Sequence, residues 1–249
     1  MKKIIIVQIV LLLLCSISLS SAGVDEMGTR MPRIFGTFSP QVGVWSKYAI
    51  LEKNTGRQLT MTMSIVGQDG DMYWYEVVNL EEGKVVVVKM LVKGDPNDPE
   101  NIQRLIIKSG NNPAQEMPMD FVMMGRRMAD HMFEKRSGIP NDSTSALKFE
   151  TIGKSQVTVQ AGSFEVVTNR IIDATDKVFG TYNFCEKVKP FGVVTSDTQD
   201  SSMELLAYGA GGKSLITEKP LLLERPPGMN EDMPQGLAPG IKNRPEVSQ

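Results

Sequence analysis

The chain is poor in cysteine and histidine, which excludes several kinds of site at once. Its 249 residues include two cysteines, Cys15 and Cys185, and one histidine, His131. We expect Cys15 to be removed with an N-terminal segment, so the mature chain has no pair for an internal disulfide. A single histidine excludes the usual His-rich zinc site, and nothing in the sequence brings Cys185 to His131 as a catalytic dyad. The sequence therefore predicts no enzyme, no metal site and no cofactor.

Basic charge in excess and long apolar runs are also missing after the first 22 residues. The chain has 27 basic and 29 acidic residues, and removal of Lys2 and Lys3 leaves a formal charge of −4. A mildly acidic chain lacks the clustered basic residues that nucleic acids attract. No later segment approaches the roughly 20 apolar residues of a transmembrane helix. We expect a soluble mature chain that neither binds nucleic acid nor spans a membrane.

The first 22 residues have the pattern of a secretory signal peptide. Lys2 and Lys3 precede an apolar run over 4–14, and small residues end the segment before Gly23. The pattern predicts export to the periplasm, with secretion beyond it left open. Lipid attachment to Cys15 is an alternative, but Leu14 stands where a small side chain is preferred, so we interpret Cys15 as part of the removed signal.

Alternation of apolar and polar residues dominates from Val44 onward and indicates β-strands. In the run 59–65 the apolar side chains Leu59, Met61, Met63 and Ile65 share one face. The run 85–92 is apolar on both faces, which predicts a central strand covered on both sides. Turns rich in Gly, Asn and Asp separate successive runs, so we expect an up-and-down antiparallel meander.

One helix is predicted to interrupt the strands. Apolar residues recur at helical spacing at Phe121, Met124, Met128 and Met132. Asp120 is a suitable N-cap, and a Gly-Ile-Pro sequence over 138–140 ends the pattern. Strands resume over 146–152 and 155–160, and the last is predicted over 214–217. The fold class is therefore mainly β (α+β), a curved antiparallel meander sheet or half-open β-barrel with one inserted amphipathic helix. It occupies residues 23–225 and precedes a disordered Pro/Gly-rich tail over 226–249.

Three stretches together resemble a group of uncharacterised exported bacterial proteins. The segment 38–48 (FSPQVGVWSKY) resembles their opening strand, 157–165 (VTVQAGSFE) their recurring hairpin, and 186–194 (EKVKPFGVV) the strand-turn-strand that follows. Such proteins are similar to the lipoprotein-carrier (LolA/LolB-like) superfamily. The resemblance, which covers roughly residues 40–220, implies a half-open antiparallel barrel with a helical lid over an apolar cavity. Gln160 replaces the usual proline of the hairpin, and no counterpart of the carrier's functional arginine is found.

Methionine is unusually frequent, with 16 residues in the chain and six of them between Met117 and Met132. The alternatives are flexible packing in the core, an adaptable apolar surface for acyl chains, and a copper site that would include His131. The acidic loop over 95–100 could hold a hard cation, but it lacks the spacing of a calcium loop, and its two prolines favour a stiff turn.

These patterns favour an exported, non-enzymatic binding protein that holds a hydrophobic small molecule or a lipidated partner protein in the concave face of a curved sheet. Desolvation alone would provide the affinity. The alternative is a structural or interaction protein of the cell envelope with a filled core, which would recruit a partner through a sheet edge or the tail. The predicted wall consists of Leu59, Met61, Met63 and Trp74, and the predicted lid of Phe121, Met124, Met128 and Met132.

Overall fold

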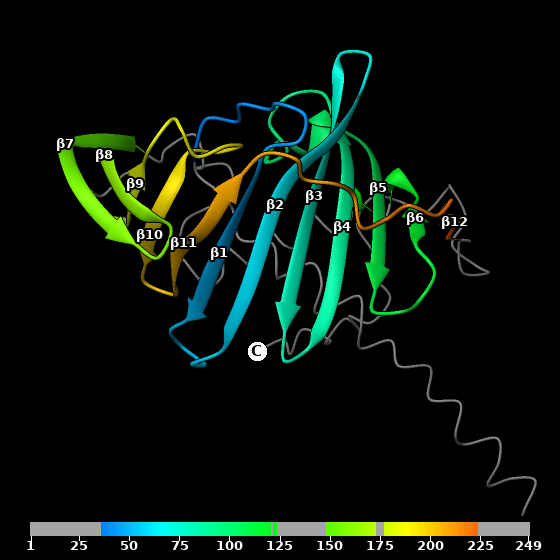
Figure 1. The fold of residues 1–249 in the computed structure, drawn as a ribbon, viewed down its shortest axis with the longest axis horizontal. Coiled ribbons are helices and arrows are strands. Elements are labelled where there is room, and N and C mark those ends of the chain that lie inside the picture. Colours follow the sequence, from blue (N-terminus) through cyan, green and yellow to red (C-terminus); the bar gives the residue numbers. More distant parts are fainter. Residues whose placement is uncertain (1–35, 121, 124–147, 173–176, 224–249) are drawn as a thin grey trace, which may run out of the picture.

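A single curved sheet forms most of the computed structural model, which describes residues 36–120, 122–123, 148–172 and 177–223 (Figure 1). Twelve strands and one short 3-10 helix lie in the described residues. They are β1 (Trp45–Glu52), β2 (Gln58–Asp69), β3 (Met72–Glu81), β4 (Lys84–Val92), η1 (Pro99–Asn101), β5 (Ile102–Ser109), β6 (Gln115–Met117), β7 (Lys148–Val159), β8 (Gly162–Ile172), β9 (Val178–Phe184), β10 (Val193–Thr198), β11 (Ser201–Gly209) and β12 (Leu221–Leu222).

Two antiparallel meanders make up the sheet. Strands β1 to β6 follow one another on one side, β7 to β11 do so on the other, and the pairing of β1 with β11 joins the two halves. The spatial order is β12-β6-β5-β4-β3-β2-β1-β11-β10-β9-β8-β7, and only the short β12 runs parallel to its neighbour β6. The sheet is not closed into a barrel, so the predicted β-rich, curved antiparallel fold is confirmed.

Several predicted elements differ in detail. The two strands predicted on either side of Gly153 form the continuous β7, because Gly153 (φ 150°) absorbs a bulge opposite β8. Residues 214–217 are not a strand, whereas the short strands β6 and β12 were not expected. Of the predicted helix, residues 119–120 and 122–123 are helical, and Val122 N–H donates to the Pro118 carbonyl at 3.2 Å. The lid residues Phe121, Met124, Met128 and Met132 lie outside the described residues.

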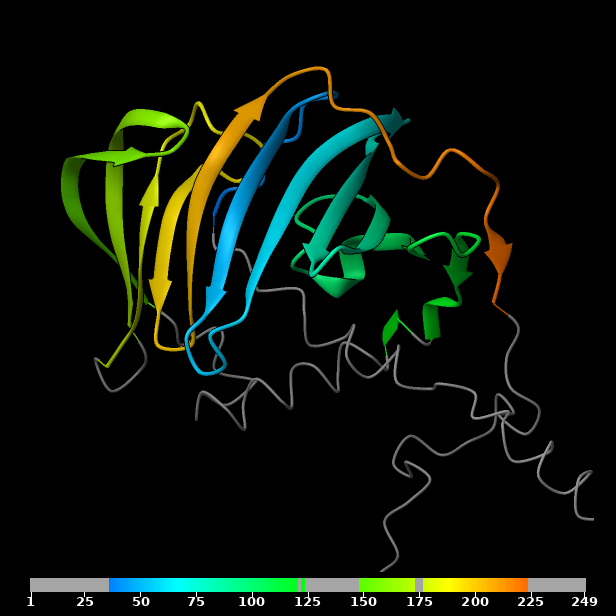
Figure 2. The same ribbon diagram turned by 60° about the horizontal axis from the view of Figure 1, so that its bottom comes forward.

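The larger core lies on the inner face of the arched sheet (Figure 2). The side chains of Met61, Met63 and Ile65 are buried there, as their alternation predicts. Tyr48 is completely buried, and its hydroxyl donates to the Val193 carbonyl at 2.9 Å. Burial raises the pKa of the Tyr48 hydroxyl above its ordinary range. This bond holds the start of β10 against β1, so strands from both meanders share one core.

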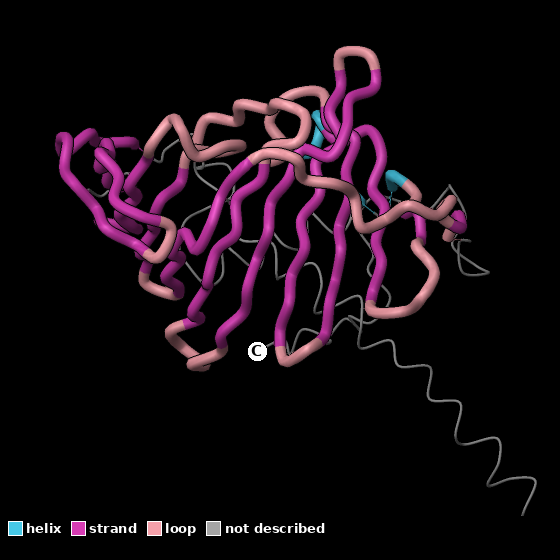
Figure 3. Tube along the Cα trace, in the orientation of Figure 1, coloured by secondary structure: helices cyan, strands magenta, loops and turns pink. Residues whose placement is uncertain are grey.

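The outer face is covered by a segment that we call the strap, residues 210–220, which crosses β1 to β6 (Figure 3). Ile216 of the strap packs with Val87, Ile106 and Ala114. Val87 faces the strap whereas the adjacent Val88 faces the inner core, which confirms that β4 is covered on both sides.

A buried glutamate fastens the strap to the sheet. Glu76 of β3 is completely buried, and its carboxylate accepts bonds from the Ser214 hydroxyl at 2.6 Å and the Leu215 N–H at 2.9 Å. Lys89, its cross-strand neighbour on β4, donates to the Ser214 hydroxyl at 2.9 Å and to the Ile216 carbonyl at 3.3 Å. The strap is therefore attached through charge-assisted hydrogen bonds as well as apolar contacts.

Farther along the strap, an exposed ion pair is expected to make stability depend on acid pH. Lys108 donates to the Glu218 carboxylate at 2.5 Å, and this bond lowers the pKa of Glu218 to about 2 from 4.5. Because the folded pKa is depressed, the contribution is present above pH 4.5 and is lost as the pH falls toward 2. We expect Glu218→Gln to be slightly less stable than wild type at pH 7 and equal to it near pH 2 in denaturant titrations.

The matched control for that titration is Glu82→Gln, which alters an exposed turn far from the strap. A Glu218→Gln deficit of the same size at every pH between 2 and 7 would contradict the assignment to the ion pair.

Candidate functional site

The centre of the inner face is filled. Met61 is 1 % exposed and Met63 is 0 % exposed, and both contact the continuous core rather than a cavity. Leu59 is half-buried and borders a hollow of about 750 Å³ near the ends of β1, β2, β10 and β11. Trp74 lies on the outer face, where it packs on the cluster around Val87. The structure therefore does not bring the four predicted wall residues together around one space.

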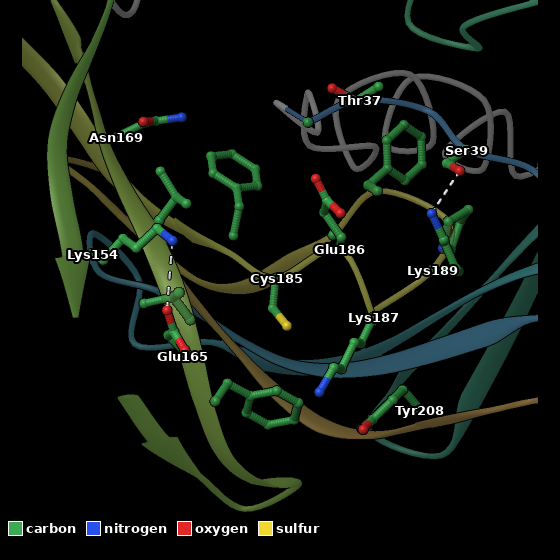
Figure 4. Close-up of a pocket in the computed structure, with 18 of the residues that line it drawn as sticks. Thr37, Ser39, Lys154, Glu165, Asn169, Cys185, Glu186, Lys187, Lys189 and Tyr208 are labelled. Atoms are coloured by element: carbon green, nitrogen blue, oxygen red, sulfur yellow. Dashed lines mark hydrogen bonds and ion pairs between the residues drawn. The ribbon is translucent and has the colours of Figure 1, made fainter. Parts of the chain in front are cut away.

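A larger hollow, of about 1100 Å³, lies between β8, β9, β11 and the loop that connects β9 to β10 (Figure 4). We call it the lateral hollow. Its lining combines aromatic and aliphatic side chains with several charged ones: Phe164, Val166, Val167, Phe184, Phe191 and Tyr208, together with Lys154, Glu165, Asn169, Glu186, Lys187 and Lys189.

The short length of β10 opens the sheet beside this hollow. Strand β10 pairs with β11 at only three positions and reaches no farther than the pair Thr195 and Glu204. Beyond that point the Leu205 carbonyl of β11 accepts a hydrogen bond from Ala161 N–H at 3.4 Å, at the turn between β7 and β8. The β7–β8 hairpin therefore bends toward β11, and the hollow lies where these elements diverge.

The loop over 185–192 forms one wall and is held firmly in place. Cys185 N–H donates to the Gly192 carbonyl at 2.7 Å, and Gly192 N–H donates to the Val188 carbonyl at 2.6 Å. Gly192 has a φ of 78°, which other residues adopt only with strain. Val188 is completely buried and Phe191 is 2 % exposed. The ring of Phe191 lies 5.3 Å from that of Phe38 and 5.8 Å from that of Tyr75.

Aromatic and aliphatic side chains provide the apolar surface of the hollow. The ring of Phe164 lies 5.6 Å from that of Tyr208, which is 39 % exposed. Val166 is buried beside them, and Phe184 stacks on Tyr182 with a ring separation of 6.1 Å. A concave surface of this composition removes water from an apolar ligand.

The charged side chains around the hollow differ in their partners. Lys154 forms an exposed ion pair with Glu165 at 3.7 Å, and Lys189 donates to the Ser39 hydroxyl at 2.7 Å. Lys187 makes no hydrogen bond or ion pair with any described residue. Figure 4 shows the Lys187 amine reaching into the hollow toward Tyr208, near the Cys185 thiol.

Glu186 and Asn169 are two further polar residues of the lining. Glu186 is turned away from Lys187, toward Thr37 (Figure 4). The Asn169 side-chain oxygen is buried and has no hydrogen-bond partner in the structure. Buried polar atoms are normally paired, so this oxygen is an exception within the described residues.

The described lining residues contain no histidine, so they provide no Cys–His dyad around Cys185. Within the described residues no group of three or more His, Cys, Asp or Glu side chains could hold a metal ion. In the acidic loop, Asp95 accepts the Asn97 N–H at 2.8 Å and Asp98 accepts the Glu100 N–H at 3.0 Å, so these carboxylates stabilise the turn itself. His131 and most of the Met-rich segment lie outside the described residues.

Sequence reasoning did not select the lateral hollow. The segments that form it were noticed only as a hairpin and a strand-turn-strand, over 157–165 and 186–194. The available signal was a run of three charged residues, Glu186, Lys187 and Lys189, directly before Pro190-Phe191-Gly192.

The described residues include no helix of the length and apolar character that a membrane crossing requires.

No family model and no curated protein matches the chain. Among solved structures it is similar to a candidate lipoprotein of Parabacteroides distasonis (12 % identity, TM-score 0.33), with 70 % of this chain and 98 % of that one covered. It is similar to MucB (10 % identity, TM-score 0.32, 79 % and 61 % covered) and to a DUF1329 family protein of Desulfovibrio piger (10 % identity, TM-score 0.30, 76 % and 90 % covered). The chain thus spans about three fifths of the MucB chain. Likenesses of this size do not assign a function.

Proposed function

We propose that the protein is an exported, non-enzymatic binding protein that holds an apolar ligand, such as the acyl chain of a lipid or of a lipidated partner, in the lateral hollow. The observation that carries the proposal is a hollow of about 1100 Å³ whose lining combines aromatic and aliphatic side chains with charged ones, beside an inner face that is filled at its centre. Small-molecule sites commonly have volumes of about 300–1,000 Å³, so the space is sufficient for a ligand.

Affinity would come from removal of apolar surface from water. Each buried methylene group contributes about 0.8 kcal/mol, so a chain of ten such groups offers several kcal/mol even after the cost of its ordering. The rigid loop over 185–192 adds to this because its position is fixed before the ligand arrives.

The direct test uses a neutral apolar dye, N-phenyl-1-naphthylamine, whose fluorescence rises in apolar surroundings. We expect saturable binding to the wild-type protein, and at least tenfold weaker binding to Val167→Trp, because Val167 is half-buried in the lining and a larger ring occupies the hollow. Val178→Trp is the matched control, since Val178 is 41 % exposed on the neighbouring β9 and does not line the hollow.

Circular dichroism and thermal unfolding of both variants verify that they are folded. Binding that is absent in wild type, or equal in Val167→Trp and Val178→Trp, would contradict the proposal.

The filled inner face also favours the second candidate, an interaction protein of the cell envelope. In the described residues β7 pairs only with β8, so the twelve-residue β7 presents an open edge to which an extended partner segment could add. Affinity capture is carried out with the whole chain, with a chain that lacks residues 226–249, and with Gln156→Pro in β7. Loss of the partner with the shortened chain indicates attachment through the tail, and loss with Gln156→Pro indicates attachment through the edge of β7. Retention of a protein partner together with no dye binding would favour this candidate.

A further inference from the structure

We propose that the ligand of the lateral hollow is an anionic amphiphile whose head group binds Lys187 while its acyl chain lies over Phe164 and Tyr208. This inference rests on the proposed function and adds the chemical class of the ligand.

Among the lysines that line the hollow, Lys187 has neither a hydrogen bond nor an ion pair with a described residue. Lys154 is neutralised by Glu165, and Lys189 is engaged by Ser39. Lys187 has no such partner within the described residues, and its amine points into the hollow (Figure 4). A carboxylate or phosphate at this position would complete a charge-assisted hydrogen bond.

Neither of the two acids that line the hollow, Glu165 and Glu186, pairs with Lys187. Glu186 is the neighbour of Lys187 in the chain, yet its carboxylate is directed toward Thr37 and away from the amine (Figure 4). Glu165 is engaged with Lys154. The space around Lys187 is therefore positive, which favours an anion over a neutral or cationic head group.

The charge of Lys187 lies next to the apolar surface of Phe164 and Tyr208, and the backbone that carries Lys187 is held in place. The backbone of Lys187 belongs to the loop anchored by Val188 and Phe191, which are 0 % and 2 % exposed. Tyr208, toward which the Lys187 amine reaches, lies beside Phe164 in the lining with its ring tilted against the phenylalanine ring. A single ligand with a charged end and an apolar chain would contact both features at once, whereas an inorganic anion would contact only the first.

The test compares four ligands with the same twelve-carbon chain, namely dodecanoate, dodecyl phosphate, dodecanol and dodecylamine, by displacement of N-phenyl-1-naphthylamine from the whole mature protein. We expect both anions to bind about tenfold more tightly than dodecanol, and dodecylamine to bind most weakly. In Lys187→Met, which keeps the length of the side chain, the ratio of anion to alcohol affinity should fall toward one. In Lys84→Met, a control at the exposed first residue of β4, the ratio should stay near ten.

Each outcome separates the two claims. If no ligand displaces the dye because the dye itself does not bind, the proposed function fails. If all four ligands bind equally, or the ratio is the same in Lys187→Met and wild type, the hollow is an apolar site and the anionic class is wrong. A preference for dodecanoate over dodecyl phosphate would indicate a fatty-acid carboxylate, and the reverse would indicate a lipid phosphate. Added salt should reduce the preference for both anions, because Lys187 is exposed.

Discussion

Replacement of Phe191 by alanine is expected to lower the free energy of unfolding by about 3–5 kcal/mol, as large-to-small substitutions of buried phenylalanine do. The Phe191 ring is 2 % exposed and packs edge-on or tilted against Phe38 and Tyr75. The loop is also enclosed on its other side, since Gly36 lies so close to it that a Cβ atom at this position would clash with the Phe191 carbonyl oxygen.

The measurement is equilibrium unfolding in urea, followed by far-ultraviolet circular dichroism. Phe191→Leu retains much of the volume and should lose less than half as much stability. The exposed Val42→Ala, at 50 % exposure, is a control that should change stability by less than about 0.5 kcal/mol. A loss below about 1 kcal/mol for Phe191→Ala would show that the loop is not anchored as described. Because Phe191 and its loop line the lateral hollow, the alanine variant should also bind the dye more weakly.

The second large effect is expected at Glu76. Glu76→Ala leaves the Leu215 N–H and the Ser214 hydroxyl without the carboxylate, and leaves Lys89 beside them without its negative neighbour. Hydrogen bonds to charged groups contribute about 1.5–3 kcal/mol each, part of which offsets the burial of the carboxylate. We therefore expect a loss of about 3 kcal/mol in urea unfolding.

Glu76→Gln provides the graded comparison. Its amide oxygen can still accept the Leu215 N–H, but the charge is gone, so an intermediate loss is expected. Glu82→Ala, in an exposed turn, should be nearly neutral. Hydrogen exchange should show faster exchange at Leu215 in Glu76→Ala than in wild type. Unchanged stability together with unchanged exchange would mean that the strap is held by the apolar contacts of Ile216 alone.

The alternation of side chains was sufficient to predict the sheet. In β2 the residues Leu59, Met61, Met63 and Ile65 face the inner core because strand geometry directs every second side chain to the same side. The doubly apolar β4 was correctly expected to be covered on both faces. These properties are local, so the sequence around each strand contains the necessary information.

The strap could not be predicted in the same way. The sequence predicts a strand over 214–217, but the backbone partners of this segment are the side chains of Glu76 and Lys89, more than 120 residues earlier in the chain. Glu76 itself stands in an apolar run, and only the covering strap shows why a carboxylate is buried there. The local pattern is the same for a strand and for a crossing segment that satisfies its polar groups elsewhere.

The site depends on volume, which alternation does not determine. Met61 and Met63 have the character expected of a cavity wall, but the space in front of them is filled, in part by the loop over 185–192. The lateral hollow arises because the pairing of β10 with β11 reaches no farther than Thr195 and Glu204. Segments near residues 37, 164, 187 and 208 meet around the resulting gap. Such a meeting of distant segments leaves no periodic signal, although the cluster of charges at Glu186, Lys187 and Lys189 was visible.

The proposal that the lateral hollow holds an acyl chain is tested most directly by native mass spectrometry of the protein purified from its native compartment. The account predicts that wild type carries a stoichiometric lipid-sized adduct, that Val178→Trp carries it too, and that Val167→Trp does not. Wild-type protein of bare polypeptide mass, with no adduct regained after incubation with dodecanoate, would contradict the account.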